Sequence, residues 1–146
     1  MASDESEQLH ALFMDLVRVA GLLQPDQDLP GHTLSLSQAY AIHELDRDTG
    51  LSQRELAERL VLEKSTVSRL VADLQLEGLL ERRRDPANRR TDRLQLTDAG
   101  RAMHAGIAAG YGARYHRWTA AMTPAERTAL LVGLPALIRV VRESKA

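Results

Sequence analysis

Six arginines lie within twelve residues of this 146-residue sequence and form its densest run of charge. They are Arg82, Arg83, Arg84, Arg89, Arg90 and Arg93. A guanidinium group carries a permanent positive charge and a planar fork of donors, which suit contacts with phosphate. The run therefore indicates a nucleic-acid contact, and the alternative is a solvated arginine-rich hairpin.

The total charge hides this concentration. The formal net charge is −1, from 19 Lys and Arg against 20 Asp and Glu. Residues 1–62 hold 4 of the basic and 11 of the acidic residues, whereas residues 63–146 hold 15 and 9. The two parts therefore have opposite signs, which indicates separate surfaces for separate tasks.

Several kinds of chemistry lack the residues that they need. The sequence has no cysteine, which excludes a thiolate nucleophile and a thiol switch. It has no GxSxG elbow, no glycine-rich phosphate loop and no HExxH motif, so we predict neither an enzyme nor a cofactor. Ala108 stands where a second histidine would complete an HxxxH pair with His104, so no metal site is predicted.

Nothing in the sequence predicts a membrane segment. The longest apolar run, residues 129–138, is about half as long as a membrane span requires. The acidic N-terminus MASDESEQ lacks the basic and apolar segments of a signal peptide. We therefore expect a soluble, cytoplasmic protein without a membrane contact.

Two short helices joined by a tight turn are predicted upstream of the arginine run. Ser52 and Glu55 have the spacing of a capping box that begins the first helix, and the break falls at Val61 and Leu62. The second helix covers residues 64–77. Its inward stripe consists of Val67, Leu70, Val71 and Leu74. The pattern is typical of a helix-turn-helix.

A β-hairpin is predicted directly after these helices, where a winged helix carries its wing. Its extended segments are residues 79–85 and 91–96, joined by the turn DPANRR. Because side chains alternate across a strand, Arg82 and Arg84 share one face and Arg83 lies on the other. The six arginines therefore cannot all meet one partner.

Two helices are predicted before the helix-turn-helix. Apolar spacing indicates a helix from about 5 to 23, and the prolines and glycine of residues 24–33 then break the chain. Ser35 and Gln38 form a second capping box, which begins a helix at 36–47.

Two more helices are predicted after the hairpin. One runs from Thr97 to about Ala121, and the other begins at the capping box of Thr123 and Glu126. We expect Pro135 to kink or open this last helix. The apolar faces at the two ends of the chain exceed what a winged domain can cover, so we predict a symmetric dimer. The alternative is a monomeric bundle.

The fold class predicted is mainly α with a small β wing: a winged helix-turn-helix flanked by N- and C-terminal dimerisation helices. Residues 1–34 would form the N-terminal dimerisation helix and linker. The winged helix-turn-helix would cover residues 35–97, and residues 98–146 would form the C-terminal dimerisation helices.

The sequence resembles the MarR family of bacterial transcriptional regulators over nearly its whole length. The resemblance rests on LSLSQ (34–38), LSQRELAERL (51–60), STVSRLVADLQLEGLLERRRDP (65–86), NRRTDRLQLTDAG (88–100) and the helices at both ends. The spacing DP-x-x-RR-x-x-x-L-x-LT-x-x-G after STVSRLV is specific for this family. Two departures are Asn88, where relatives often carry Asp at the wing tip, and Pro135.

The resemblance implies a homodimer that binds a pseudopalindromic double-stranded DNA operator, most simply as a repressor. The 64–77 helices would enter successive major grooves and the wings the flanking minor grooves, with Arg90 as the inserted side chain. Asp85 would brace the wing by pairing with an arginine. The DNA-binding candidates are Ser52, Gln53, Lys64, Ser65, Thr66, Ser68, Arg69, Arg89 and Arg90.

Many relatives lose DNA affinity when a small aromatic or phenolic ligand enters a cleft beside the winged domain. The ligand candidates here are Arg18, Tyr40, His43 and Tyr111. His43 has the alternative of a packed core histidine, and Arg18 that of a solvated side chain or an ion pair. The alternative functions are a zinc-sensing module and a winged helix used for protein contacts.

Overall fold

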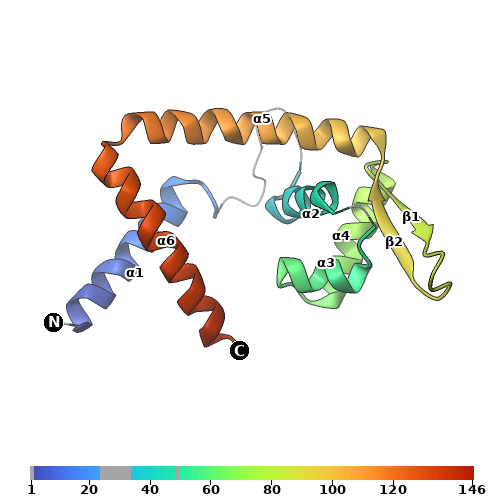
Figure 1. The fold of residues 1–146 in the computed structure, drawn as a ribbon, viewed down its shortest axis with the longest axis horizontal. Coiled ribbons are helices and arrows are strands. Elements are labelled where there is room, and N and C mark those ends of the chain that lie inside the picture. Colours follow the sequence, from blue (N-terminus) through green and yellow to red (C-terminus); the bar gives the residue numbers. More distant parts are fainter. Residues whose placement is uncertain (1, 24–33, 49) are drawn as a thin grey trace. The chain divides into compact units, whose positions relative to one another are not determined.

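The structure is a computed structural model that describes residues 2–23, 34–48 and 50–146. It divides into two compact units, one up to Ile107 and one from Ala108 onward. The elements are α1 (Ala2–Val19), α2 (Leu36–Arg47), α3 (Gln53–Leu60), α4 (Lys64–Leu76), β1 (Leu80–Arg84), β2 (Asp92–Leu96), α5 (Asp98–Ala121) and α6 (Pro124–Ser144) (Figure 1). The predicted fold class, mainly helical with a two-stranded wing, is confirmed. The predicted break at 24–33 lies outside the described residues.

The helix starts follow the capping signals of the sequence. Ser35 and Gln38 form a capping box at α2, and Ser52 and Glu55 form one at α3. In each box the side chain at the cap and the side chain three residues later satisfy one backbone N–H of the other residue. The sequence therefore sets these two helix starts locally.

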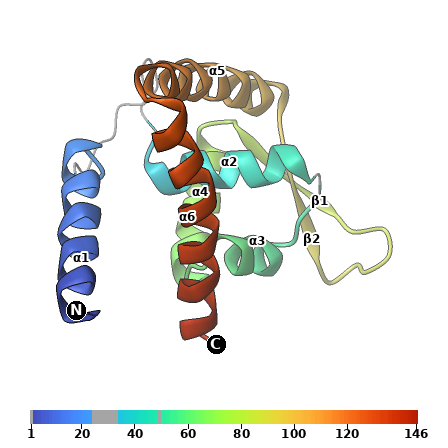
Figure 2. The same cartoon turned by 60° about the vertical axis from the view of Figure 1, so that its left-hand side comes forward.

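Helices α2, α3 and α4 enclose the apolar core of the winged domain, and the hairpin extends away from them (Figure 2). The largest fully buried side chains are Ile42, Leu45, Leu56, Leu74, Leu80, Leu94, Val67 and Val71. They come from these three helices and both strands. Each such side chain contributes about 2 kcal/mol of transfer free energy, so this region has a core of its own.

The turn between α3 and α4 is sharp because Val61 adopts a left-handed backbone conformation, with φ 54° and ψ 45°. It is the one residue other than glycine with positive φ in the described ranges. Its N–H bonds the carbonyl oxygens of Ala57 and Glu58, which closes α3. A β-branched residue is strained in this conformation.

The wing is an antiparallel pair in which Leu80 faces Leu96 and Arg82 faces Leu94. Leu94 also pairs with Leu51, which ties the hairpin to the segment before α3. The leucines of β2 are buried and the residues between them are exposed or half-buried, as the alternation predicted.

The start of α5 packs closely against the end of α4. Thr97 donates its hydroxyl to the carbonyl oxygen of Gly78 and accepts from the N–H of Gly100. A Cβ atom at Gly100 would lie 2.1 Å from the carbonyl oxygen of Leu79. Only glycine fits this contact.

The helices at the two ends of the chain, α1 and α6, have apolar faces that are not buried in a core. None of the described side chains of α1, from Asp4 on, is buried, and neither is any in α6. Helix α6 continues through Pro135 as one helix. No helix in the described part of the chain is long and apolar enough to cross a membrane.

Candidate nucleic-acid interface

The exposed side of α4 presents cations and hydroxyls from its first two turns. Lys64, Ser65, Ser68 and Arg69 are exposed, and Thr66 is half-buried. The apolar stripe of the same helix points into the core, because the two sets of residues differ in their place in the helical period. Glu63, the residue at the N-cap, makes no side-chain bond to the helix. The first turn of α4 therefore lacks a side-chain cap, an arrangement that suits an anion.

The start of α3 is closed by its own side chains. The carboxylate of Glu55 accepts from the Ser52 N–H at 2.7 Å, and the Ser52 hydroxyl oxygen accepts from the Glu55 N–H at 3.1 Å. The backbone N–H of Ser52 first, and then its hydroxyl group, lower the pKa of Glu55. The backbone N–H of Ser52 is therefore engaged within the helix start and is not free for a partner. Gln53 differs, because its side-chain oxygen accepts from Arg82 at 3.0 Å.

The tip of the wing carries two arginines whose guanidinium groups have no partner among the described residues. Arg89 and Arg90 are exposed, and neither forms an ion pair with any described residue. Asn88 closes the tip: its side-chain oxygen accepts from the Arg90 N–H at 3.2 Å, and its backbone oxygen accepts from the Thr91 N–H at 3.0 Å. The amide of Asn88 thus shapes the tip without an ion pair.

The base of the wing is held by a buried carboxylate. Asp85 is only 7% exposed and accepts from the Ala87 N–H at 2.9 Å and from Arg93 Nε at 3.0 Å. The Ala87 N–H first, and then Arg93, lower the pKa of Asp85. Arg93 also donates to the Gly50 carbonyl oxygen at 2.6 Å. The prediction that Asp85 braces the wing through an arginine is confirmed.

The six arginines of the run therefore serve different purposes. Arg93 fixes the hairpin to the segment before α3, and Arg83, which lies opposite Arg93 on the same face of the wing, pairs with Glu81. Arg82 donates to side chains of both α3 and α4. Arg84, Arg89 and Arg90 are exposed and form no ion pair with a described residue, and the last two are the cations of the tip.

The four ligand candidates lie on three different helices. Arg18 forms an ion pair with Asp15 within α1. Tyr40 is exposed on α2 and His43 lies about one turn later. Tyr111 belongs to the second unit and forms a tilted ring contact with Tyr115, at a centroid distance of 6.5 Å. The ligand site stays a prediction.

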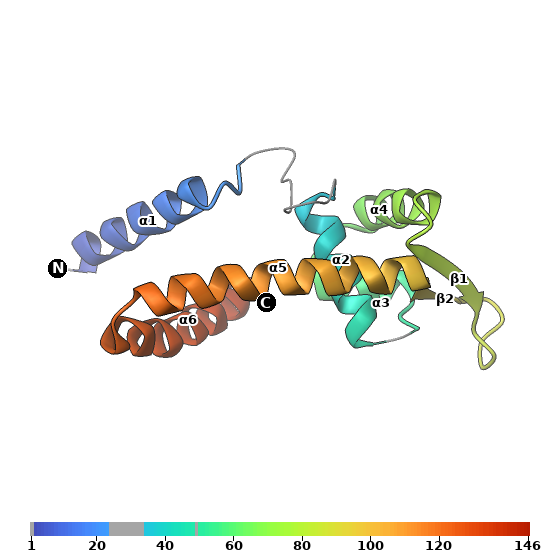
Figure 3. The same ribbon diagram turned by 90° about the horizontal axis from the view of Figure 1, so that it is seen from above.

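His43 has a partner that its position in the sequence does not reveal. Its Nδ1 lies 3.2 Å from Nε2 of His104 on α5, and Nδ1 of His104 lies 3.2 Å from a carboxylate oxygen of Asp46. Viewed from above, the first half of α5 runs over α2 (Figure 3). The three side chains join α2 to α5. Among the residues that the structure describes, no group of three His, Cys, Asp or Glu could hold a metal ion.

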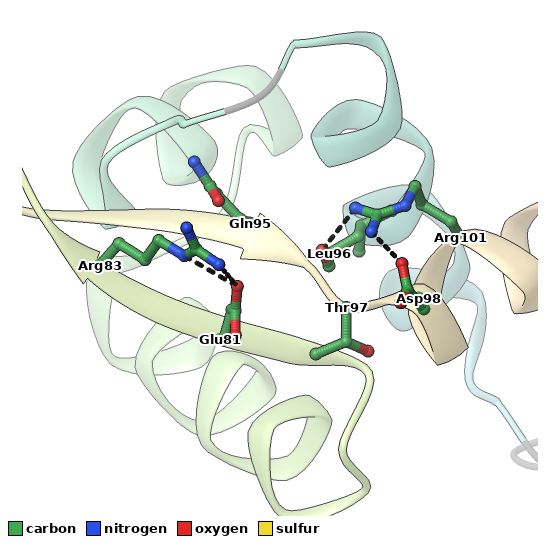
Figure 4. Close-up of a pocket in the computed structure, with 7 residues that line it drawn as sticks. All are labelled: Glu81, Arg83, Gln95, Leu96, Thr97, Asp98 and Arg101. Carbon is green, nitrogen blue, oxygen red and sulfur yellow. Dashed lines mark hydrogen bonds and ion pairs between the residues drawn. The ribbon is translucent and has the colours of Figure 1, made fainter.

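A hollow of about 350 Å³ lies between the outer face of the hairpin and the start of α5. It is lined by Glu81, Arg83, Gln95, Leu96, Thr97, Asp98 and Arg101. Arg83 turns to Glu81, and Arg101 turns to Asp98 and to the Leu96 carbonyl oxygen (Figure 4). Both cations are neutralised, and none of the ligand candidates lines this hollow.

Sequence reasoning missed Gln75, Arg82 and Asp46 as partners of predicted site residues. Gln75 had one usable signal, because it lies seven residues after Ser68 and so on the same side of α4. No such signal existed for Arg82 or Asp46. The partner of Arg82, Gln53, is distant in the sequence, and the partner of Asp46, His104, belongs to another helix.

These elements define the class of the protein. A tight pair of helices, an exposed second helix and a hairpin with a basic tip make a winged helix-turn-helix.

The comparisons with known proteins agree with this class. Residues 32–91 match the model of the MarR family. The structure is similar to FabT from Streptococcus pneumoniae in complex with DNA, with 20% identity, TM-score 0.79 and coverage of 98% of this chain and 99% of that one. It is also similar to a MarR family transcription regulator with 23% identity and TM-score 0.82, over 98% of this chain and 96% of the other.

A third similar structure is PcaV from Streptomyces coelicolor in complex with its natural ligand, with 24% identity and TM-score 0.66, over 97% of this chain and 91% of that one. The comparison with curated sequences gives no match. Residues 32–91, which contain α2 to β1, therefore match the MarR family of transcriptional regulators, and the chain as a whole has the fold of such regulators.

Proposed function

We propose that this chain acts as a homodimer that binds a pseudopalindromic operator and represses transcription. The observation that carries the proposal is the set of unpaired polar and cationic side chains at the start of α4 and at the wing tip. They belong to a domain whose buried polar side-chain atoms, in the described residues, all have partners. The exposed side chains of α4 and the wing tip are therefore available to bind a partner and are not needed to stabilise the fold.

Helix α4 has the dimensions and side chains for a major groove. A helix fits this groove, and short hydroxyl side chains such as Ser65 and Ser68 can approach base edges or phosphates closely. Lys64 and Arg69 reach further, to phosphate or guanine. Arg89 and Arg90 would enter or border the minor groove, where negative potential attracts guanidinium groups.

A dimer accounts for the apolar faces at the ends of the chain. Leu12 is 62% exposed on α1 and Leu131 is 76% exposed on α6. Exposed apolar helix faces of this kind mark interaction sites. A two-fold dimer would also present two α4 helices to half-sites about one helical turn apart.

The test is a fluorescence anisotropy titration with a duplex from upstream of the protein's own gene. We expect Arg90→Ala to weaken binding about tenfold and to lower the salt dependence by roughly one unit per subunit, because a cation that displaces counterions is lost. Arg83→Ala is the matched control, since it removes an arginine of the same hairpin that is paired with Glu81. Equal effects of the two variants, or no binding by the wild type, would reject the proposal.

An effector site remains part of the proposal, with Arg18, Tyr40, His43 and Tyr111 as its residues. PcaV is described with its natural ligand, and arginine and tyrosine are residue types that suit an aromatic carboxylate. We expect 4-hydroxybenzoate or salicylate to raise the melting temperature and to release the operator. Neither effect at millimolar concentration would exclude phenolic acids as effectors.

A further inference from the structure

Arg82 connects the hairpin to both helices of the helix-turn-helix. From β1, its Nη2 donates to Oε1 of Gln53, the first residue of α3, at 3.0 Å. Its Nε donates to Oε1 of Gln75, in the last turn of α4, at 3.3 Å. Two donors of one planar group therefore hold two amide side chains at once.

The chemistry of the three groups fixes the direction of the amides. A guanidinium group has donors only, so it can bond only to the oxygen of an amide. The oxygen of Gln53 therefore faces Arg82, and its NH₂ group faces elsewhere. Within the described part of the chain, this NH₂ group has no hydrogen-bond partner. Gln53 thus offers the two N–H donors of its amide to a partner outside the chain, while its oxygen faces Arg82.

We infer that Arg82 is a positioning residue for DNA binding: anchored by Gln75, it turns the amide of Gln53 so that the NH₂ group meets a backbone phosphate. Phosphate oxygens accept and do not donate, so only this orientation of the amide is attractive. Without the guanidinium, the amide would also sample the reverse orientation, which places oxygen against oxygen. The inference rests on the proposed function and assigns Arg82 no contact with DNA.

The surroundings of Arg82 distinguish it from the arginines of the wing tip. The guanidinium groups of Arg89 and Arg90 have no partner in the described residues, whereas the Nε and Nη2 donors of Arg82 are both engaged within the protein. Its charge is nevertheless close to Gln53. A test must therefore separate the effect of the charge from the effect of the two directed hydrogen bonds.

Arg82→Lys makes this separation, because lysine keeps the charge but cannot hold two amides with a planar fork. We expect about tenfold weaker binding, equivalent to about one hydrogen bond in each half of the dimer. Phosphate contacts carry no sequence information, so affinity for an unrelated duplex should fall by the same factor. In a Gln53→Ala background, Arg82→Lys should cause no further loss.

Two results would overturn the inference. Unchanged binding by Arg82→Lys would mean that the charge alone matters, and equal losses with and without Gln53 would mean that Arg82 acts without that amide. Melting temperatures of all variants are measured alongside, because a purely structural role would lower them and weaken binding regardless of residue 53.

Gln53→Glu supplies a second test that preserves the contact with Arg82. The carboxylate still accepts from the guanidinium but offers phosphate a negative charge, so we expect more than tenfold weaker binding. Gln95→Glu, on the other face of the hairpin, is the control for the added charge. Equal losses in the two variants would contradict the inference. If wild type binds and Arg90→Ala behaves as proposed while these variants do not, the inference alone fails.

Discussion

Similar apolar side chains are buried in the winged domain and exposed on the terminal helices. In the winged domain Ile42, Leu56 and Leu94 are 0% exposed, whereas Ile138 of α6 is 53% exposed and Leu131 is 76% exposed. The terminal helices are as apolar as the core, so composition does not explain the difference. One region closes its core within a single chain, and the other leaves its apolar side chains exposed, as the proposed dimer requires.

The largest effect is expected where the winged domain is packed most tightly. Gly100→Ala would place a Cβ atom 2.1 Å from the Leu79 carbonyl oxygen and 3.2 Å from the Leu96 Cβ. Because the first atom belongs to the backbone, the start of α5 must move, at a cost of about 3 kcal/mol. The free energy of unfolding from urea titration would measure this.

Gly112→Ala in the same helix is the control, since a Cβ atom there has nothing within 4 Å. A similar stability of the two variants would contradict the tight packing at Gly100.

The second prediction concerns the apolar face of α6. Ile138→Glu should leave the winged domain folded but weaken the dimer, because burying a charge in place of an apolar side chain opposes association. Losing about 2 kcal/mol in each protomer would raise the dissociation constant of the dimer roughly 1,000-fold. Analytical ultracentrifugation would measure the association, and circular dichroism the fold.

Ser144→Glu adds the same charge at the last residue of α6 and should leave association unchanged. Equal association of wild type and Ile138→Glu would show that this face of α6 does not form the dimer.

Local signals predicted most of the fold. The capping boxes at Ser35, Ser52 and Thr123 lie where the sequence places them, because each needs only residues three positions apart. The first helix was predicted to reach residue 23 but ends at Val19. Gly21 adopts φ 75°, and the Leu22 N–H bonds the Val17 carbonyl oxygen. Apolar residues at helical spacing continue past Val19, although the backbone leaves the helix there. The apolar pattern alone therefore predicted a helix that is too long.

The candidate site was predicted residue by residue but not as a network. The helical period identified the exposed residues of α4, and strand alternation separated Arg82 from Arg83. The contact of Arg82 with Gln53 joins residues 29 apart, and that of His43 with His104 joins residues 61 apart. Such contacts depend on how the elements pack, and no local spacing encodes them.

The third prediction concerns the strained turn of the winged domain. Val61 has φ 54° and is 75% exposed, so its side chain contributes little burial to offset the strain. Val61→Gly should raise the free energy of unfolding by about 1 kcal/mol, the relief of strain less the greater entropy that glycine loses on folding. Thermal unfolding would measure the gain.

Val132→Gly on α6 is the control for this substitution. Val132 is an exposed valine inside a helix, where the change to glycine should destabilise. A loss of stability in both variants would show that the turn at Val61 is not strained.

The smallest effect is expected for Gly133→Ala, which tests whether Gly133 on α6 faces solvent or an interface. A Cβ atom at Gly133 would have nothing within 4 Å, so Gly133→Ala should stabilise the helix by about 0.8 kcal/mol. Ala136→Gly is the reverse change in the same helix and should cost a similar amount.

Gly133 lies towards the edge of the stripe formed by Leu130, Leu134, Leu137 and Val141, and we expect its alanine variant to dimerise as the wild type does. A higher melting temperature combined with weaker dimerisation would instead place Gly133 inside the interface, where a neighbouring helix needs the space that glycine leaves.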